Sequence, residues 1–221
     1  MKTSADLRLK TAFQTTVWSA HDLLQISGEA GLICLEQRPL WVDNSLRRAP
    51  FVVVRRAESV DGMIPVGVRG SSRKQRFPAY LAPESILKQI APEQLTESHG
   101  WRDNTRSQIV PSLNAWAEIE ENLFNFSLVY GPTGSVGFEL ATGLPTATAA
   151  SDLDLLFRVP ECLPITAARE LMAILAETAC RIDAQLEAPR GAFSLTEYAS
   201  GQTPLLLRQN RGPVLVDDPW A

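Results

Sequence analysis

The sequence predicts an α/β protein of the α+β kind. A small, mostly β N-terminal domain is expected over residues 1–90, and a second domain with a mixed sheet flanked by helices over residues 91–221. Two patterns predict this fold. Short β-branched runs separated by turn residues fill the first half, whereas helical and strand patterns alternate in the second. The length of 221 residues also exceeds that of one average domain.

Three segments of the first half have a clear pattern. The run 51–56 is β-branched, which predicts a strand. Residues 64–70 alternate apolar residues with Pro and Gly and predict a strand or an edge strand. Residues 83–90 begin with Pro and have apolar spacing that predicts a short helix. The polar stretch 91–106 has no clear periodicity, so we place the domain boundary there.

The second half alternates between helices and strands. Apolar spacing predicts helices over 112–123, 136–142 and 166–180. Apolar runs predict strands over 125–130, 152–159 and 182–186. The turn 131–135 joins the first of these strands to a helix. Such alternation favours a mixed layered structure.

Charge is unevenly distributed along the chain. Residues 1–90 carry 13 Lys and Arg against 8 Asp and Glu, whereas residues 91–221 carry 8 against 17. The total net charge of −4 argues against a polycation that coats nucleic acid. A sign change between halves fits two domains with different tasks, although an ordinary charged surface would produce it too.

Composition leaves little support for several other classes. Cys34, Cys162 and Cys180 are widely spaced, so neither a disulfide framework nor a zinc ribbon is indicated. With only His21 and His99, a His-rich metal site is excluded by supply. The N-terminus lacks a signal-peptide pattern, and no apolar run approaches the roughly 18 residues of a membrane span. We therefore expect a cytoplasmic protein with free thiols and no membrane or nucleic-acid partner.

Two aspartates on one predicted strand are the strongest chemical signal. Because side chains alternate faces along a strand, Asp152 and Asp154 project from the same face. Two neighbouring carboxylates repel each other unless a cation lies between them. Mg²⁺, with water and substrate phosphate as further ligands, suits such a pair. Short Asp-x-Asp matches also arise by chance, with one aspartate at a strand end and the other exposed to solvent.

Two nearby features point to the same chemistry. Gly134 and Ser135 follow a predicted strand and begin a helix, where backbone N–H groups can hold a phosphate. An ordinary Gly-rich turn would have the same sequence. Asp183 lies between apolar residues on the next predicted strand, which costs desolvation unless the carboxylate is bound or at a strand end. An aspartate at a sheet edge facing water is the alternative. The residues alone lead to metal-assisted nucleotidyl transfer.

The order of these parts resembles the polymerase beta-type nucleotidyltransferase superfamily. This resemblance implies a catalytic domain with a nucleotidyltransferase-type mixed sheet over residues 91–221, preceded by a basic substrate- or partner-binding domain over residues 1–90. Over most of its length the chain resembles the malonate decarboxylase holo-(acyl-carrier-protein) synthase family. The segments that carry this closer resemblance are 64–77, 130–143, 151–156, 183–198 and 212–220. Two features depart from the superfamily pattern. The loop between Ser135 and Asp152 is longer than usual, and the lead-in contains Gly131 as well as Gly134, so either glycine could fill the motif position.

The resemblance implies specific roles for these residues. Asp152, Asp154 and Asp183 would hold two Mg²⁺ ions, with Asp183 binding the ion that activates the attacking hydroxyl. Gly134 and Ser135 would hold the triphosphate of the donor, 2′-(5″-triphosphoribosyl)-3′-dephospho-CoA. The implied acceptor is a serine of the acyl carrier protein subunit of malonate decarboxylase. The implied products are a carrier protein bearing the phosphoribosyl-dephospho-CoA group and pyrophosphate.

A basic cluster in the first half is a second candidate site. Arginine binds phosphate in a bidentate manner, so Arg69, Arg73 and Arg76 are candidates for donor binding. Docking of an acidic carrier protein is an alternative role, and a solvated loop is another. Arg208 and Arg211 near the C-terminus are weaker candidates of the same kind.

Other functions are also compatible with parts of the pattern. A nucleotidyltransferase with a different acceptor, or an inactive nucleotide-binding module, would share the same motifs. A metal-dependent glycosyltransferase would use Asp-x-Asp but leaves Gly134, Ser135 and Asp183 unexplained. A phosphatase that forms an aspartyl phosphate would have Thr or Val where this chain has Leu156.

Overall fold

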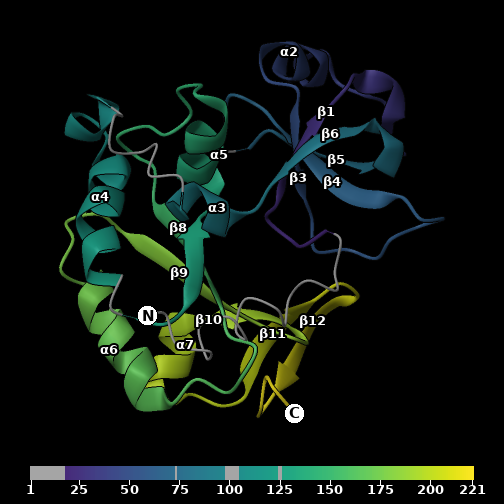
Figure 1. The fold of residues 1–221 in the computed structure, drawn as a ribbon. Helices are drawn as coiled ribbons and strands as arrows, with labels where there is room; N and C mark the ends of the chain where they lie inside the picture. The colour runs from purple at the N-terminus through teal and green to yellow at the C-terminus, as the bar shows by residue number, and fades with distance from the viewer. Residues whose placement is uncertain (1–17, 73, 98–104, 124–125) are drawn as a thin grey trace, which may run out of the picture.

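The chain forms two sheets of six strands each, one from each half of the sequence (Figure 1). The computed structural model describes residues 18–72, 74–97, 105–123 and 126–221. The strand orders are β2-β5-β4-β3-β1-β6 and β12-β11-β10-β9-β8-β7. Helices accompany both sheets, so the predicted α+β class is confirmed.

The first sheet is antiparallel at every pairing. Its elements are β1 Leu23–Ile26, β2 Leu32–Ile33, α2 Leu40–Arg48, β3 Phe51–Val54, β4 Ile64–Arg69, β5 Arg76–Leu81 and β6 Ile86–Ile90, with 3-10 turns at Glu29–Gly31 and Pro83–Ser85. Alternation along β3 buries Val52 and Val54, as the period of a strand with one covered face requires. Val42 and Leu46 of α2 pack on the same cluster.

One predicted element of this half is wrong. The segment 83–90 is not a helix: after one 3-10 turn it becomes β6, which pairs antiparallel with β1. Its apolar spacing satisfies a strand as well as a helix, and pairing of Ile90 opposite Leu23 decides between them. The strand predicted over 64–70 is confirmed as β4, which lies inside the sheet between β5 and β3.

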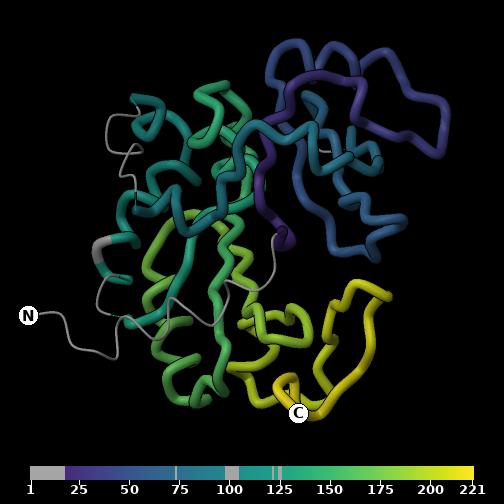
Figure 2. Tube along the Cα trace, turned by 45° about the vertical axis from the view of Figure 1, so that its right-hand side comes forward, coloured from purple at the N-terminus to yellow at the C-terminus, as the bar shows by residue number. Residues whose placement is uncertain are grey.

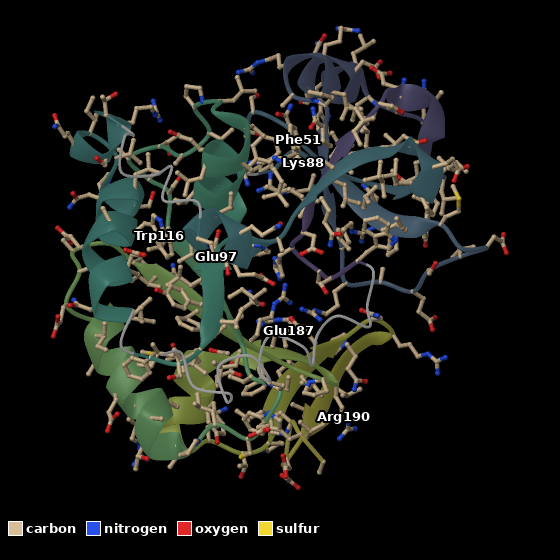
Figure 3. All side chains as sticks on the ribbon, viewed as in Figure 1. Phe51, Lys88, Glu97, Trp116, Glu187 and Arg190 are labelled. Atoms are coloured by element: carbon tan, nitrogen blue, oxygen red, sulfur yellow. The ribbon has the colours of Figure 1, made fainter. Side chains whose placement is uncertain are left out.

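The second sheet contains the single parallel pair among the described strands, β8 with β9. Its elements are α3 Pro92–Glu97, α4 Pro111–Leu123, β7 Val129–Pro132, α5 Gly134–Thr142, β8 Leu153–Arg158, α6 Ile165–Leu175, β9 Ile182–Ala188, β10 Gly191–Ser194, α7 Leu195–Ser200, β11 Leu205–Gln209 and β12 Gly212–Val216, with a 3-10 turn at Thr105–Gln108. α6 is the crossover that a parallel pair requires. Figure 3 shows Trp116 on the inner side of α4, and this side chain is fully buried with Phe157.

Most elements predicted for the second half are confirmed, with shifted ends. The strand predicted over 125–130 corresponds to β7, which ends two residues later than predicted, at Pro132. Residue 125 lies outside the described residues. The helix predicted over 166–180 ends at Leu175. Nothing in the sequence reasoning anticipated β10, α7, β11 or β12. Trp220 packs against Phe193 and Tyr198 and donates from Nε1 to the Val159 carbonyl at 2.9 Å.

Two groups of contacts join the sheets. An apolar cluster from both halves consists of Leu23, Ala49, Ile90, Leu95 and Phe138. Figure 2 shows the first sheet beside α5 and above the β11–β12 hairpin, with the segment from β6 to α3 running between the sheets. This cluster therefore forms the apolar part of the boundary between the two halves.

Ion pairs complete that boundary. Arg56, just after β3, binds Glu187 of β9 through both guanidinium nitrogens, with Nη1 to Oε1 at 2.8 Å. Arg158 of β8 lies 3.7 Å from Asp22 and 3.4 Å from Glu93. The exposed pair of Arg211 and Glu58, at 2.6 Å, joins the two halves at the rim. Figure 3 places Glu187 between the sheets.

Two further observations concern the chain as a whole. Cys34, Cys162 and Cys180 are all free thiols. Among the described residues, no helix is both long enough and apolar enough to cross a membrane.

Candidate active site

Asp154 and Asp183 occupy paired positions on the parallel strands β8 and β9. Partners in a parallel ladder have side chains on the same face of the sheet, so these two carboxylates leave the sheet together. Asp154 is half-buried and Asp183 is exposed. The sequence gives no hint of this register, because the two residues are separated by the whole of α6.

Gly134 lies directly against Asp154. A Cβ built on Gly134 would come within 1.7 Å of Asp154 Oδ2, and the glycine has a left-handed φ of 59°. The backbone N–H of Thr133 donates to the Asp154 carbonyl at 2.8 Å, which fixes the turn against β8. Only glycine combines that conformation with so close an approach.

The other glycine of the lead-in has a different environment. A Cβ on Gly131 would meet the backbone of Pro92 at 2.0 Å, so Gly131 lets β7 pack against α3. Gly134 is therefore the glycine of this turn that lies beside the carboxylates. Ser135 is buried in the first turn of α5, where its carbonyl accepts from Thr146 Oγ1 at 3.0 Å.

Asp152 immediately precedes β8 and is half-buried near Cys180. Burial raises the pKa of the Cys180 thiol, and the Asp152 charge adds to this increase. Within the described ranges, no group of three or more His, Cys, Asp or Glu side chains lies close enough to form a metal site. Asp154 with Asp183 is the carboxylate pair that the strand register aligns, and Asp152 lies two positions before Asp154.

The long loop between α5 and β8 is anchored by one buried carboxylate. Glu139 Oε2 accepts from the backbone N–H groups of Thr146 and Ala147, both at 2.9 Å. Arg106 donates to Glu139 Oε1 at 2.8 Å and to the Ala147 carbonyl at 2.7 Å. These bonds hold the extra length of the loop against α5, so it leads Asp152 into β8 along a defined path.

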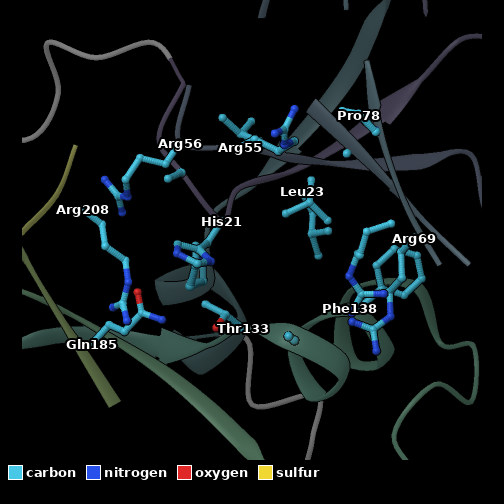
Figure 4. A pocket seen from close by; sticks show the side chains of 18 of the residues that line it. His21, Leu23, Arg55, Arg56, Arg69, Pro78, Thr133, Phe138, Gln185 and Arg208 are labelled. Carbon is cyan, nitrogen blue, oxygen red and sulfur yellow. The ribbon is translucent and has the colours of Figure 1, made fainter. Parts of the chain in front are cut away.

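A cavity of about 740 Å³ opens beside this edge of the sheet. Both halves of the chain line it: Thr133, Gly134 and Phe138 come from the second, and Arg69 and Arg76 from the first. This volume is within the range of small-molecule and cofactor sites. Figure 4 shows Phe138 and Arg69 side by side at one end of the cavity.

The basic residues predicted for donor binding divide into two cases. Arg69 and Arg76 are cross-strand partners on β4 and β5, and both line the cavity. Burial lowers the pKa of Arg69 to about 10, with the Arg76 charge adding to this and the Asp154 carboxylate opposing it. The Arg69 guanidinium lies 5.9 Å from the centre of the Phe138 ring. Arg73 lies outside the described residues.

The cavity also contains residues to which sequence reasoning gave no role. His21, Arg55, Arg56 and Gln185 line it, and the weak candidate Arg208 joins them. These residues are far apart in the chain, so no local spacing could have grouped them. Arg211 is absent from the lining and pairs with Glu58.

The residues present fit the requirements of Mg²⁺. Carboxylate oxygens are the hard ligands this ion prefers, and Asp154 and Asp183 present them on one face. Gly134 lines the cavity and lies directly against the Asp154 carboxylate, since a Cβ on Gly134 would meet Asp154 Oδ2 at 1.7 Å. Asp154 and Asp183, with Asp152 beside them, are therefore the residues that would hold the metal.

Comparison with known families matches both halves of the chain. Residues 19–92 match the family model described as phosphoribosyl-dephospho-CoA transferase MdcG N-terminal domain. Residues 101–219 match the model described as phosphoribosyl-dephospho-CoA transferase MdcG C-terminal domain. No solved structure matches the chain significantly.

Curated relatives extend this match to nearly full length. A Pseudomonas putida protein is 43% identical over 204 residues, covering 91% of this chain and 94% of the relative. A Pseudomonas fluorescens Pf-5 protein is 38% identical over 212 residues, covering 92% and 94%. A Klebsiella pneumoniae protein is 38% identical over 200 residues, covering 90% and 95%. Each relative is named phosphoribosyl-dephospho-CoA transferase. Matched by both family models and by these relatives, the chain belongs to the phosphoribosyl-dephospho-CoA transferase family, a family of transferases.

Proposed function

We propose that this protein acts in the cytoplasm as a holo-(acyl-carrier-protein) synthase of malonate decarboxylase. It transfers the phosphoribosyl-dephospho-CoA group from 2′-(5″-triphosphoribosyl)-3′-dephospho-CoA to a serine of the acyl carrier protein subunit. The serine Oγ forms a bond to the α-phosphorus of the donor. The bond from that phosphorus to the β-phosphate bridging oxygen breaks, and pyrophosphate leaves.

One observation supports this proposal most directly. Asp154 and Asp183 share a face of the sheet, Asp154 lies against Gly134, and Gly134 lines the cavity together with Arg69 and Arg76. Carboxylates next to an arginine-lined cavity are arranged for a metal-bound polyphosphate, whereas carboxylates alone would repel it. The membership of the transferase family gives this geometry a matching substrate class.

The chain's own residues would divide the work between the two halves. Arg69 and Arg76 bind the negative charge of the triphosphate from the side of the first sheet. The turn at Gly134 and Ser135 brings the first N–H groups of α5 toward the same phosphates. Asp154, Asp183 and Asp152 would hold two Mg²⁺ ions, which supply charge stabilisation for the attacking hydroxyl and for the leaving pyrophosphate.

The decisive experiment is a mass measurement on the carrier protein. The carrier subunit of malonate decarboxylase is incubated with this protein, Mg²⁺ and the triphosphoribosyl donor. We expect a mass increase equal to one phosphoribosyl-dephospho-CoA group, with stoichiometric pyrophosphate. Modification of another carrier only would show a different acceptor. Donor binding without transfer to any carrier would show an inactive nucleotide-binding module.

Asp154→Asn tests the role of the carboxylates. Loss of one metal-binding carboxylate removes several kcal/mol of transition-state stabilisation, so we expect transfer to slow by about 1000-fold. The matched control is Asp61→Asn, because Asp61 is exposed in a turn with a φ of 51° that asparagine also tolerates. Transfer by Asp154→Asn at the rate of the control would contradict the assignment.

A further inference from the structure

The cavity has a second basic end, away from Gly134. We define the hairpin end as His21, Arg56, Gln185 and Arg208. Figure 4 shows these side chains gathered on one side of the cavity, with Arg69 and Phe138 on the opposite side. They come from the segment before β1, the end of β3, β9 and β11.

The hairpin end carries an excess of positive charge. Among the residues that the structure describes, the cavity is lined by five arginines and by no Asp or Glu: Arg55, Arg56, Arg69, Arg76 and Arg208. The charge of Arg56 is paired with Glu187, which is not a lining residue of the cavity, whereas Arg208 is exposed on β11 at the hairpin end. A concave surface lined by cations concentrates anionic ligands.

His21 contributes a neutral hydrogen-bonding group. Burial lowers its pKa to about 4, and the charge of Arg56 is the next cause, with Arg158 and Arg208 acting in the same direction. The imidazole is therefore uncharged at neutral pH and offers one N–H donor. Gln185 adds an amide donor from β9. Phosphate oxygens are the acceptors that such a set of donors suits.

Apolar side chains also line the cavity, and Figure 4 places Leu23 between the two basic ends. Leu23, Ile90 and Leu95 are buried side chains of the cluster that joins the sheets, and they also line the cavity. Apolar surface of this kind accommodates the ring of a nucleoside. Two basic ends with an apolar middle suit one ligand that carries two separate anionic groups joined by a nucleoside.

We propose that the hairpin end binds the 5′-diphosphate of the dephospho-CoA half of the donor, with Arg208 as the main charged contact. The adenosine lies over the apolar middle, and the triphosphate reaches Gly134 at the other end. This inference rests on the proposed function, because that donor carries both a triphosphate and a diphosphate. The inference adds to the proposed function a binding site for the dephospho-CoA half of the donor, formed by residues from both halves of the chain.

The test uses two probes that each carry one of the anionic groups. Binding of dephospho-CoA and of inorganic tripolyphosphate to the full-length protein is measured by calorimetry in the presence of Mg²⁺. Arg208→Gln should weaken dephospho-CoA about 10-fold, since a charged hydrogen-bond donor is lost, and leave tripolyphosphate within about two-fold. Arg69→Gln should show the reverse pattern. Arg211→Gln, an exposed arginine of the same hairpin outside the cavity, should change neither affinity.

Each other outcome overturns the inference. Unchanged dephospho-CoA binding by Arg208→Gln would show that the diphosphate binds elsewhere. Equal weakening by Arg211→Gln would show only a general effect of charge. Failure of the unmodified protein to bind dephospho-CoA would remove the proposed subsite altogether. The carrier mass measurement is independent of all three, so transfer can succeed while this inference fails.

Discussion

The two sheets differ in pairing and in the charged residues that they contribute to the candidate site. The first is antiparallel throughout and contributes Arg69 and Arg76 from neighbouring strands. The second contains the parallel pair β8–β9 and contributes Asp154 and Asp183. The proposed function thus assigns anion binding and metal binding to different sheets, so a ligand that needs both would touch both halves.

The difference teaches that the packing of one sheet against the other is part of the site. Each half buries its own apolar cluster. The position of Arg69 and Arg76 relative to Asp154 and Asp183 depends on the contacts between the halves, which are the smaller apolar cluster and the ion pairs at the boundary. Substitutions in one half should therefore change the rate of transfer, whereas substitutions at the boundary should change the free energy of unfolding or its dependence on pH.

Among the variants that test this comparison, Gly134→Ala should have the largest effect, because it disturbs the turn that lies against Asp154 in the second sheet. Its Cβ would meet Asp154 Oδ2 at 1.7 Å, so the turn or the carboxylate must move. We expect transfer to fall by about 100-fold, because catalytic geometry tolerates little displacement. Single-turnover transfer to the carrier protein measures this.

Gly143→Ala is the matched control for that variant. Gly143 ends the same helix with a φ of 71°, and a Cβ there would meet nothing within 4 Å. It should cost about 1 kcal/mol of stability through backbone strain and leave transfer almost unchanged. An equal loss of transfer in both variants would mean that strain alone, and not contact with Asp154, is responsible.

Glu187→Gln should weaken the boundary. Both side chains of the Arg56–Glu187 pair are largely buried, at 15% and 13% exposure, and the variant leaves Arg56 without its carboxylate. We expect the free energy of unfolding to fall by about 2 kcal/mol, below the full effect of a completely buried pair. Urea unfolding measures the change.

The exposed pair across the same boundary provides the comparison. Arg211 and Glu58 are 84% and 56% exposed, so Glu58→Gln should change the free energy of unfolding by less than about 0.5 kcal/mol. Similar losses in Glu187→Gln and Glu58→Gln would show that burial does not distinguish the two pairs.

The smallest net effect is expected from pH, because two neighbouring residues should give opposite responses. Burial raises the pKa of Asp22 to about 6, although bonds from Ser19 and Gln89 oppose the increase. The stability from this residue is present below pH 4 and is lost as the pH rises through 6. His21, with a pKa lowered to about 4, contributes stability that is present above pH 6.5 and lost as the pH falls toward 4.

These responses should largely cancel in the unmodified protein. Asp22→Asn should leave the His21 response, so the free energy of unfolding rises between pH 4 and 6.5. His21→Asn should leave the Asp22 response, so it falls over the same range. Asparagine tolerates the left-handed φ of 76° at position 21, which limits backbone strain. Parallel pH profiles for the two variants would contradict the assignment of these pKa shifts.

Local patterns predicted the elements that carry the carboxylates. Asp154 and Asp183 were assigned to strands because apolar neighbours alternate around them, and Gly143 ends α5 as a glycine C-cap should. The segment 83–90 was misread because its spacing fits two periods and only pairing with β1 separates them. Local patterns contain no information about such a partner.

Local sequence patterns predict only some of the residues that line the cavity. Arg69 and Arg76 were grouped because they are close in the chain, and they are cross-strand partners. His21 and Arg208 meet only because β11 lies opposite the segment before β1, across the boundary of the two sheets. Their proximity is a property of tertiary packing, and a single sequence does not contain it in any local spacing.

The parallel register of Asp154 and Asp183 also bears on how the protein folds. The two residues are 29 positions apart, and they become neighbours only when β9 has returned across α6 to pair with β8. Closing that long loop is slow compared with forming a hairpin such as β11–β12. Until β9 has paired with β8 the chain has no aligned carboxylate pair, so the proposed metal site depends on the completion of this non-local pairing.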